Sequence, residues 1–304
     1  MEEQSLPITI EVGSEIRAVT FTANGEYLVG GCKDGVRVWR VTDMELMATM
    51  EESRMSVYCL AVSTDGSWIA GGTLWGEVLV WDSKTYEKVC TFKENDETIW
   101  GVDFSPDSTQ LVVAKQKSTA IVWDRPLGKK VQTLEHSGLL RVVKYSPLGD
   151  RIATATRNSV RVWVSNDGHC HLLVDIEAGV EPWHNTGLCW FKNHLFVVSN
   201  DEIKQFDAST GSEVSRWSTP KSDKFSCITL SQRGEFIAYS TTRTIMFWDA
   251  STHAQLTVID LPHDIGPIAL SPDDQFLAIC EEEKITCRSV SHITVSIIFF
   301  QVAL

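Results

Sequence analysis

Seven short apolar segments, each ending at the same position of a repeat, recur along the chain about every 42 residues. Six end in a large aromatic residue and one in arginine: Trp39, Trp81, Trp123, Trp163, Phe206, Trp248 and Arg288. The successive intervals, by subtraction, are 42, 42, 40, 43, 42 and 40 residues. A period of about 40–45 residues with four short strands is typical of one blade of a β-propeller. The repeat therefore predicts an all-β, seven-bladed propeller of four-stranded antiparallel blades, occupying residues 1–304 as a single unit.

A second marker lies about 18 residues before most of these anchors, where two apolar runs must reverse direction. Its clearest copies are Ser105-Pro106-Asp107, Ser146-Pro147-Leu148-Gly149 and Ser271-Pro272-Asp273. Looser copies begin at Thr22, Ser63 and Ser231. Serine, proline, aspartate and glycine each favour tight turns, so the six copies predict hairpin loops in register with the anchors.

In four repeats the anchor is followed by aspartate, as in Trp81-Asp82 and Trp248-Asp249. With the Ser-Pro-Asp turns, this pattern resembles the WD-repeat family over residues 6–290. The chain departs from that family where a glycine-histidine pair usually opens each repeat, since only Glu135-His136 comes close. The usual aspartate of the turn before the anchor survives as Asp34 and Asp201, and Trp75 and Asn158 replace it elsewhere. We therefore expect the buried hydrogen-bond network of the family to be incomplete here.

The two ends of the chain compete to close the ring. The last repeat supplies three clear strands, and residues 6–12 (LPITIEV) occupy the place of an outer strand just before the first inner strand. Pairing of the terminal strands would remove the open edge, which otherwise invites aggregation. The apolar tail 291–304 could take the same place, and the sequence leaves its role open.

Net charge and cysteine usage indicate which partners and which cellular location to expect. The chain carries 27 basic and 40 acidic residues, a formal net charge of −13, which disfavours a broad nucleic-acid surface. It shows no secretory signal pattern and no apolar run long enough for a membrane helix. The eight cysteines are scattered without a Cys-x-x-Cys motif, which favours reduced thiols and a cytoplasmic location.

Local motifs give no support for catalysis, a metal or a cofactor. His169-Cys170-His171 lies in an outer-strand pattern without a third ligand at useful spacing. The run Glu281-Glu282-Glu283 is typical of a solvated turn and lacks the spaced oxygen ligands of a calcium loop. We expect neither an enzyme nor a cofactor.

A binding face is the stronger candidate. In a propeller, the loops leading into the inner strands and the turns before the anchor strands gather around one mouth of the channel. The positions that fall there are rich in Trp, Tyr and Arg, the residue types that dominate interface energetics. The predicted site residues are Arg17, Tyr58, Trp75, Trp100, Arg141, Arg157, Trp183, His184 and Arg243. The alternative is that these aromatic residues are wedged between blades.

Two classes of function remain open. The first is a non-catalytic scaffold or sensor module that binds a protein or peptide partner, most simply an acidic or aromatic-rich peptide. The second is a small-ligand or sugar-binding propeller, or a divergent propeller enzyme. The mouth positions differ from blade to blade, which favours one irregular partner over a repeated ligand site. The divergent repeats also resemble the C-terminal propellers of fungal NACHT-type signalling proteins, which would make this chain the sensor portion of a larger multidomain protein.

Overall fold

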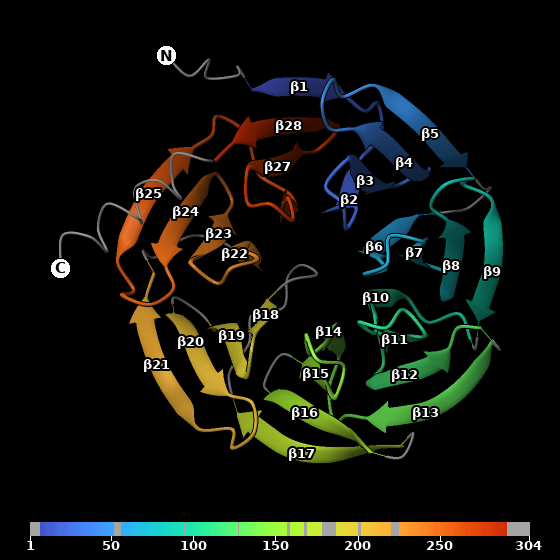
Figure 1. The fold of residues 1–304 in the computed structure, drawn as a ribbon, viewed down its shortest axis with the longest axis vertical. Helices are drawn as coiled ribbons and strands as arrows, with labels where there is room; N and C mark the ends of the chain where they lie inside the picture. Colours follow the sequence, from blue (N-terminus) through green and yellow to red (C-terminus); the bar gives the residue numbers. More distant parts are fainter. Residues whose placement is uncertain are drawn as a thin grey trace.

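The computed structural model describes residues 7–51, 56–93, 95–126, 128–156, 159–166, 169–177, 187–199, 202–219 and 225–290. Seven antiparallel sheets of four strands each are arranged as a ring around a central axis, as Figure 1 shows. The fold predicted from the repeat period is therefore confirmed. All seven anchors lie in the third strand of their blades.

The bounds of the strands follow blade by blade. The first blade contains β2 (Ile16–Phe21), β3 (Tyr27–Cys32), β4 (Gly35–Arg40) and β5 (Leu46–Glu51). The second contains β6 (Val57–Val62), β7 (Trp68–Thr73), β8 (Glu77–Asp82) and β9 (Lys88–Lys93). The third contains β10 (Ile99–Phe104), β11 (Gln110–Lys115), β12 (Thr119–Asp124) and β13 (Lys129–Glu135). The fourth contains β14 (Leu140–Tyr145), β15 (Arg151–Thr156), β16 (Ser159–Asn166) and β17 (His169–Glu177). The fifth contains β18 (Leu188–Phe191), β19 (His194–Ser199), β20 (Glu202–Asp207) and β21 (Glu213–Ser218). The sixth contains β22 (Phe225–Leu230), β23 (Phe236–Thr241), β24 (Thr244–Asp249) and β25 (Gln255–Asp260). The seventh contains β26 (Ile268–Leu270), β27 (Phe276–Glu281), β28 (Lys284–Ser289) and β1 (Ile8–Glu11).

The N-terminal strand closes the ring, as the sequence predicts. Strand β1 pairs antiparallel with β28, from Ile8 opposite Cys287 to Glu11 opposite Lys284. The Lys284 ammonium lies 2.9 Å from the Glu11 carboxylate at one end of this ladder. The seventh blade thus combines the beginning of the chain with its last three described strands (Figure 1). Residues 291–304 lie outside the described part of the chain, so the role of the tail stays open.

The anchor side chains pack between blades. Trp39, only 4% exposed, belongs to the same apolar cluster as Ile285 of the seventh blade. Its ring leaves no room at Gly30, where an added Cβ would lie 2.8 Å from the indole. In the first two blades a glycine of the second strand therefore admits the large anchor ring, since an added Cβ at Gly71 would likewise lie 3.1 Å from Trp81.

The Ser-Pro-Asp turns owe their recurrence to one hydrogen-bond pattern. In all six turns the Ser or Thr hydroxyl oxygen accepts a hydrogen bond from the backbone N–H five residues later, at 2.8–3.1 Å. In four of them the same hydroxyl donates to an Asn or Asp two residues on, at 2.5–2.7 Å; these acceptors are Asn24, Asp65, Asp107 and Asp273. The side chains satisfy backbone groups that the reversal would leave without partners.

The aspartate after the anchor fixes the next hairpin. Asp82 accepts hydrogen bonds from the backbone N–H groups of Lys84 and Thr85, both at 2.8 Å. These bonds favour the charged carboxylate and lower its pKa. Asp207 and Asp249 form the same pair of bonds in their own blades.

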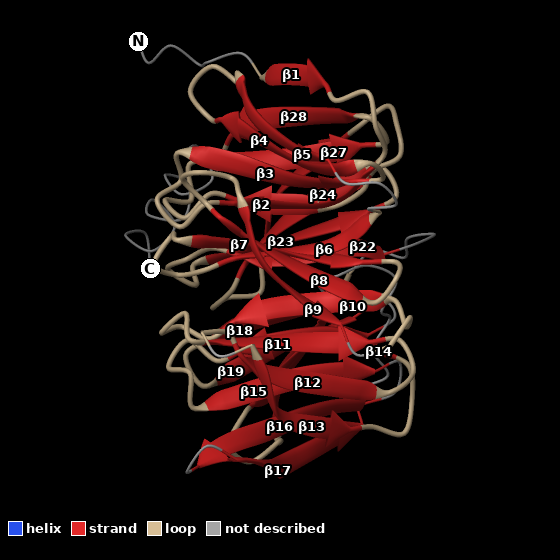
Figure 2. Ribbon diagram, turned by 90° about the vertical axis from the view of Figure 1, so that its right-hand side faces the viewer, coloured by secondary structure: helices blue, strands red, loops and turns tan. Residues whose placement is uncertain are grey.

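The loops of the ring divide between two faces. The loops leading into the inner strands and the turns before the anchor strands form the entry face, which bears residues 15–17 and 33–34. The Ser-Pro-Asp loops form the exit face, which bears residues 22–26 and 146–150. Figure 2 shows the strands lying between these two layers of loops.

Candidate functional site

A local irregularity aims side chains at the channel mouth on the entry face. At the start of five inner strands the pairing register with the second strand shifts by one residue, at a β-bulge. The inserted residues are Arg17, Tyr58, Trp100, Arg141 and, for the backbone of the sixth blade alone, Ser226. Such bulges redirect a side chain out of the regular alternation and are common beside functional sites.

The first four of these residues form a continuous arc across four blades. The Arg17 guanidinium carbon lies 4.3 Å from the centre of the Tyr58 ring. The rings of Tyr58 and Trp100 meet edge to face, with centroids 5.2 Å apart. Arg141 then covers Trp100, at 3.8 Å from the ring centre. We call this set the aromatic arc. Four predicted site residues thus lie in contact on the entry face, and their role in binding stays a prediction.

The arc borders a pocket of about 560 Å³ at the mouth of the channel. Arg17, Tyr58 and Trp100 line it. Four acidic residues also line it: Glu15, Asp264, Glu282 and Glu283. The lining therefore combines one arginine with four acidic groups. An acidic peptide is correspondingly disfavoured.

Some of these charges are already paired. Arg17 lies 3.0 Å from Glu15, and Arg243 lies 2.9 Å from Asp264. Glu282 and Glu283 form no ion pair within the described residues, and both are exposed. The unpaired charge of the pocket is therefore negative.

Trp100 carries one further feature. Its indole N–H is buried without a hydrogen-bond partner among the described residues. Burial also lowers the pKa of Arg141, which lies over the same ring, from its usual range. A buried donor without a partner costs stability, so this position is not optimised for folding alone.

The remaining predicted residues divide into two groups. Trp75, 49% exposed in the turn between β7 and β8, lies on the entry face but does not line the pocket. Arg243, in the turn between β23 and β24, reaches the pocket through its pair with Asp264. Arg157, Trp183 and His184 lie outside the described residues.

Traces of the family's buried network survive in single blades. In the fourth blade the Trp163 indole N–H donates to Thr154 at 2.8 Å, and the His136 ring meets Trp163 edge to face. In the sixth blade the buried Trp248 N–H has no partner among the described residues. Asp34 bonds Arg37 through both carboxylate oxygens at 2.8 Å, which lowers its pKa to about 2.

The described part of the chain contains neither a cluster of metal ligands nor a membrane-spanning helix. In it, no three His, Cys, Asp or Glu side chains are grouped as metal ligands. The described residues also contain no helix of the length and apolar character that crossing a membrane requires.

Comparison with known proteins bears on the same repeats. The model of the family described as WD domain, G-beta repeat matches residues 44–82, 86–124 and 128–164. These segments each end at or next to an anchor aromatic of the second, third and fourth blades. The chain therefore carries WD repeats within a seven-bladed β-propeller. WD-repeat propellers are typically scaffolds for protein interactions.

One curated relative is similar over half of the propeller. The Periodic tryptophan protein 2 homolog of Dictyostelium discoideum is 27% identical over 159 residues, which are 50% of this chain and 17% of the relative. The match therefore spans a small part of that protein.

Sequence reasoning identified only part of the acidic lining. The run Glu281-Glu282-Glu283 is typical of a solvated turn, and Glu282 and Glu283 are exposed in the turn before the last anchor strand. That turn is equivalent to the turns that supply Trp75 and Arg243, so the same positional rule places Glu283 at the mouth. Glu15 and Asp264 lie in loops leading into inner strands, and they were not among the predicted site residues.

Proposed function

We propose that the entry face of this propeller binds an extended segment of a partner protein without catalysing a reaction. A basic side chain of that segment enters the pocket beside Tyr58 and Trp100 and faces the carboxylates of Glu282 and Glu283. The observation that supports this proposal best is the pairing of an aromatic wall with unpaired acidic groups in one pocket of about 560 Å³. Cations are attracted both to carboxylates and to the faces of aromatic rings.

The irregularity of the mouth supports a single partner. Arg, Tyr, Trp and Arg occupy equivalent positions in four consecutive blades. A sugar-binding propeller would be expected to repeat one aromatic-polar site in several blades. Four different side chains in one arc are better suited to an asymmetric peptide surface, in which a few Trp, Tyr and Arg anchors contribute most of the affinity.

A charge-reversal experiment tests the proposal. Three fluorescent decapeptides, one rich in Arg and Trp, one rich in Glu and Trp, and one neutral, would be titrated with the chain at low and moderate salt. The basic peptide should bind most tightly, and Glu283→Lys should weaken it about threefold to tenfold. The matched control is Glu87→Lys, another exposed glutamate just before an outer strand on the exit face. Tighter binding of the acidic peptide, or equal effects of both substitutions, would reject the proposal.

A small cationic ligand is a second candidate for the same pocket. Its volume falls in the range of about 300–1,000 Å³ typical of ligand sites. Arginine amide used as a competitor separates the two. Displacement of the basic peptide by arginine amide at equal concentration would favour a small ligand, whereas a peptide that binds far more tightly supports a protein partner.

The cellular location and the class of partner are also proposals. We propose a cytoplasmic location, supported by eight cysteines that are all free thiols, six of them buried. The formal net charge of −13 supports a protein partner over nucleic acid. A role as the sensor portion of a larger NACHT-type protein rests on the style of the repeats alone.

A further inference from the structure

One blade lacks the loop that the other six carry on the exit face. Between the first and second strands, six blades have a five-residue loop: 22–26, 63–67, 105–109, 146–150, 231–235 and 271–275. In the fifth blade β18 ends at Phe191 and β19 begins at His194, so only residues 192–193 connect them. The fifth blade is therefore recessed between the longer loops of its two neighbours.

A pocket of about 490 Å³ lies at this recess. Trp190, Phe191 and Leu230 provide its apolar lining, and the loops of the fourth and sixth blades form its sides. Its volume falls in the range of about 300–1,000 Å³ typical of ligand pockets. It lies on the face opposite the aromatic arc, so the two pockets share no lining residue.

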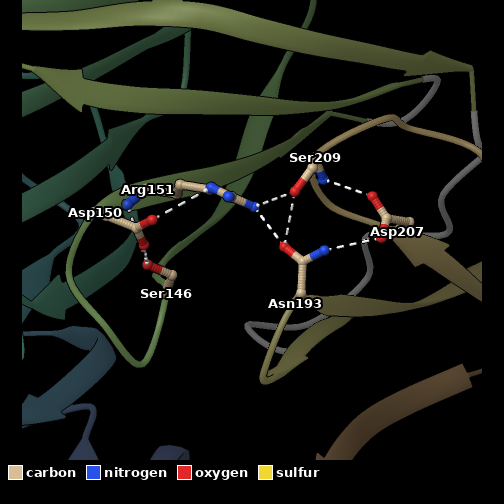
Figure 3. Close-up of polar contacts among 6 residues, drawn as sticks. All are labelled: Ser146, Asp150, Arg151, Asn193, Asp207 and Ser209. Atoms are coloured by element: carbon tan, nitrogen blue, oxygen red, sulfur yellow. Dashed lines mark hydrogen bonds and ion pairs between the residues drawn. The ribbon is translucent and has the colours of Figure 1, made fainter.

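The walls of the recess are held in place by specific contacts. Arg151 donates hydrogen bonds to the Asn193 carbonyl oxygen at 2.5 Å and to the Ser209 hydroxyl at 3.0 Å, joining the fourth blade to the fifth (Figure 3). Asn193 in turn donates to Asp207 at 2.8 Å. On the other side the Phe191 ring lies against the backbone of Gly234, where an added Cβ would clash with it. The recess is thus a preorganised cavity, which lowers the entropy cost of binding.

An unusual leucine stands at its rim. Leu148 occupies the position that Asp65, Asp107 and Asp273 hold in other turns. The turn no longer needs an aspartate there, because Ser146 bonds Asp150 instead, at 2.8 Å (Figure 3). Leu148 lines the pocket and is 86% exposed, the most exposed large apolar side chain among the described residues. Leu148 thus adds an apolar side chain to the same pocket that Phe191 and Leu230 line.

The recess also carries unpaired positive charge in an acidic protein. The Lys192 ammonium lies 5.0 Å from the centre of the Phe191 ring, and Lys192 is exposed. It forms no ion pair with any side chain that the structure describes. The other lining cation, Arg151, lies 3.5 Å from Asp150 and is held in the network above. A carboxylate entering the recess would therefore meet Lys192 as its free partner.

We propose that this exit-face recess is a second docking site, for a partner segment that places a large apolar residue next to an acidic residue. The apolar side chain packs against Leu148, Phe191 and Leu230, and the carboxylate pairs with Lys192. The proposal is independent of the entry-face site, because it uses different residues on the opposite face. Two such sites would let the propeller hold two partners at once.

Selection from a displayed library of random decapeptides tests this proposal. The wild-type chain is immobilised, and a tenfold excess of a soluble double variant, Leu148→Asp with Lys192→Glu, removes peptides that bind elsewhere. Surviving peptides should combine Leu, Phe or Trp with a neighbouring Asp or Glu. In fluorescence titrations of one survivor, Leu148→Asp should weaken binding about tenfold or more, and Lys192→Glu about threefold to tenfold.

The variants are chosen to leave the fold intact. Leu148→Asp restores the residue type found in other turns, and Lys192 is exposed. Leu139→Asp is the matched control, since Leu139 is 51% exposed in an entry-face loop, and it should leave binding unchanged. Glu283→Lys should also have no effect, so failure of the entry-face proposal would not be mistaken for failure here.

Three results would overturn the proposal. The first is that no peptide survives the competition. The second is that the surviving peptides lack acidic residues. The third is that they bind the Lys192→Glu variant as tightly as the wild type. A fourth result would replace the partner by the chain itself. If peptides bind only after Phe299 and Phe300 of the tail are changed to serine, the tail fills the recess and a separate partner is excluded.

Discussion

Replacing Trp100 by alanine tests whether the aromatic arc is a binding surface or part of the core. The change removes the edge-to-face contact with Tyr58 and the stacking of Arg141. An aromatic pair contributes about 0.5–1.5 kcal/mol, and a partly exposed cation–π contact about 0.5–1 kcal/mol. Loss of an indole N–H that is buried without a partner offsets about 1 kcal/mol of this. The free energy of unfolding should therefore fall by only about 0–1.5 kcal/mol.

Trp81 is the matched control. It is 2% exposed and packs between the first and second blades, so Trp81→Ala should cost about 3–5 kcal/mol. Urea unfolding followed by far-ultraviolet circular dichroism measures both changes. Trp100→Phe keeps a ring and removes the orphaned N–H, and its stability should remain within about 1 kcal/mol of the wild type. If Trp100→Ala is as destabilising as Trp81→Ala, Trp100 is a core residue and the arc is not a binding surface.

Three further predictions concern the ring. Deleting residues 1–12 removes β1, so the melting temperature should fall and concentration-dependent association should appear in size-exclusion chromatography; a truncated chain that melts like the full one would contradict the closure. Burial lowers the pKa of His136 to about 4, below the unfolded value of about 6.5, so its contribution to stability is present above pH 6.5 and is lost toward pH 4. Between pH 6.5 and pH 4, the free energy of unfolding of the His136→Leu variant should therefore fall by up to about 3 kcal/mol less than that of the wild type. Parallel pH–stability curves for the two proteins would refute this. Gly72→Ala should cost about 1–3 kcal/mol because the new Cβ would lie 2.5 Å from the Cys59 sulfur, while Gly66→Ala, in open space, should cost about 1 kcal/mol from its positive φ alone; equal losses in chemical denaturation would show that packing is not the cause.

The fold could be predicted because its determinants are local and repeated. An aromatic anchor recurs in six of the seven blades, and a Ser or Thr hydroxyl stabilises the first hairpin of six blades, so the same spacing recurs along the sequence. The closing strand could be inferred for a related reason, since the last repeat lacked one of four strands. The two-residue hairpin at Lys192 occurs in one blade only, and its sign in the sequence is the absence of a turn motif. The size of the pocket beside this hairpin cannot be read from the sequence.

The candidate site was harder to predict because it depends on relations between blades. The bulges that aim Arg17 and Trp100 into the mouth are shifts of pairing register, and a single strand does not reveal its register. The acidic lining of the pocket is assembled from loops far apart in the chain, so Glu15 and Glu283 become neighbours only when the ring closes. Local patterns therefore identified the arc and only part of the acidic lining.

The pairing of β1 with β28 has a consequence for how the protein is made. Ile8 meets Cys287, so β1 has no pairing partner until β28, about 280 residues later in the chain, has been synthesised. At about 5–20 residues per second, this delay is roughly 15–60 s. During it, the apolar side chains of Ile8 and Ile10 have no sheet to join, and the first blade lacks its neighbour on one side. A ribosome that stalls before β28 therefore leaves an open ring with an unpaired strand.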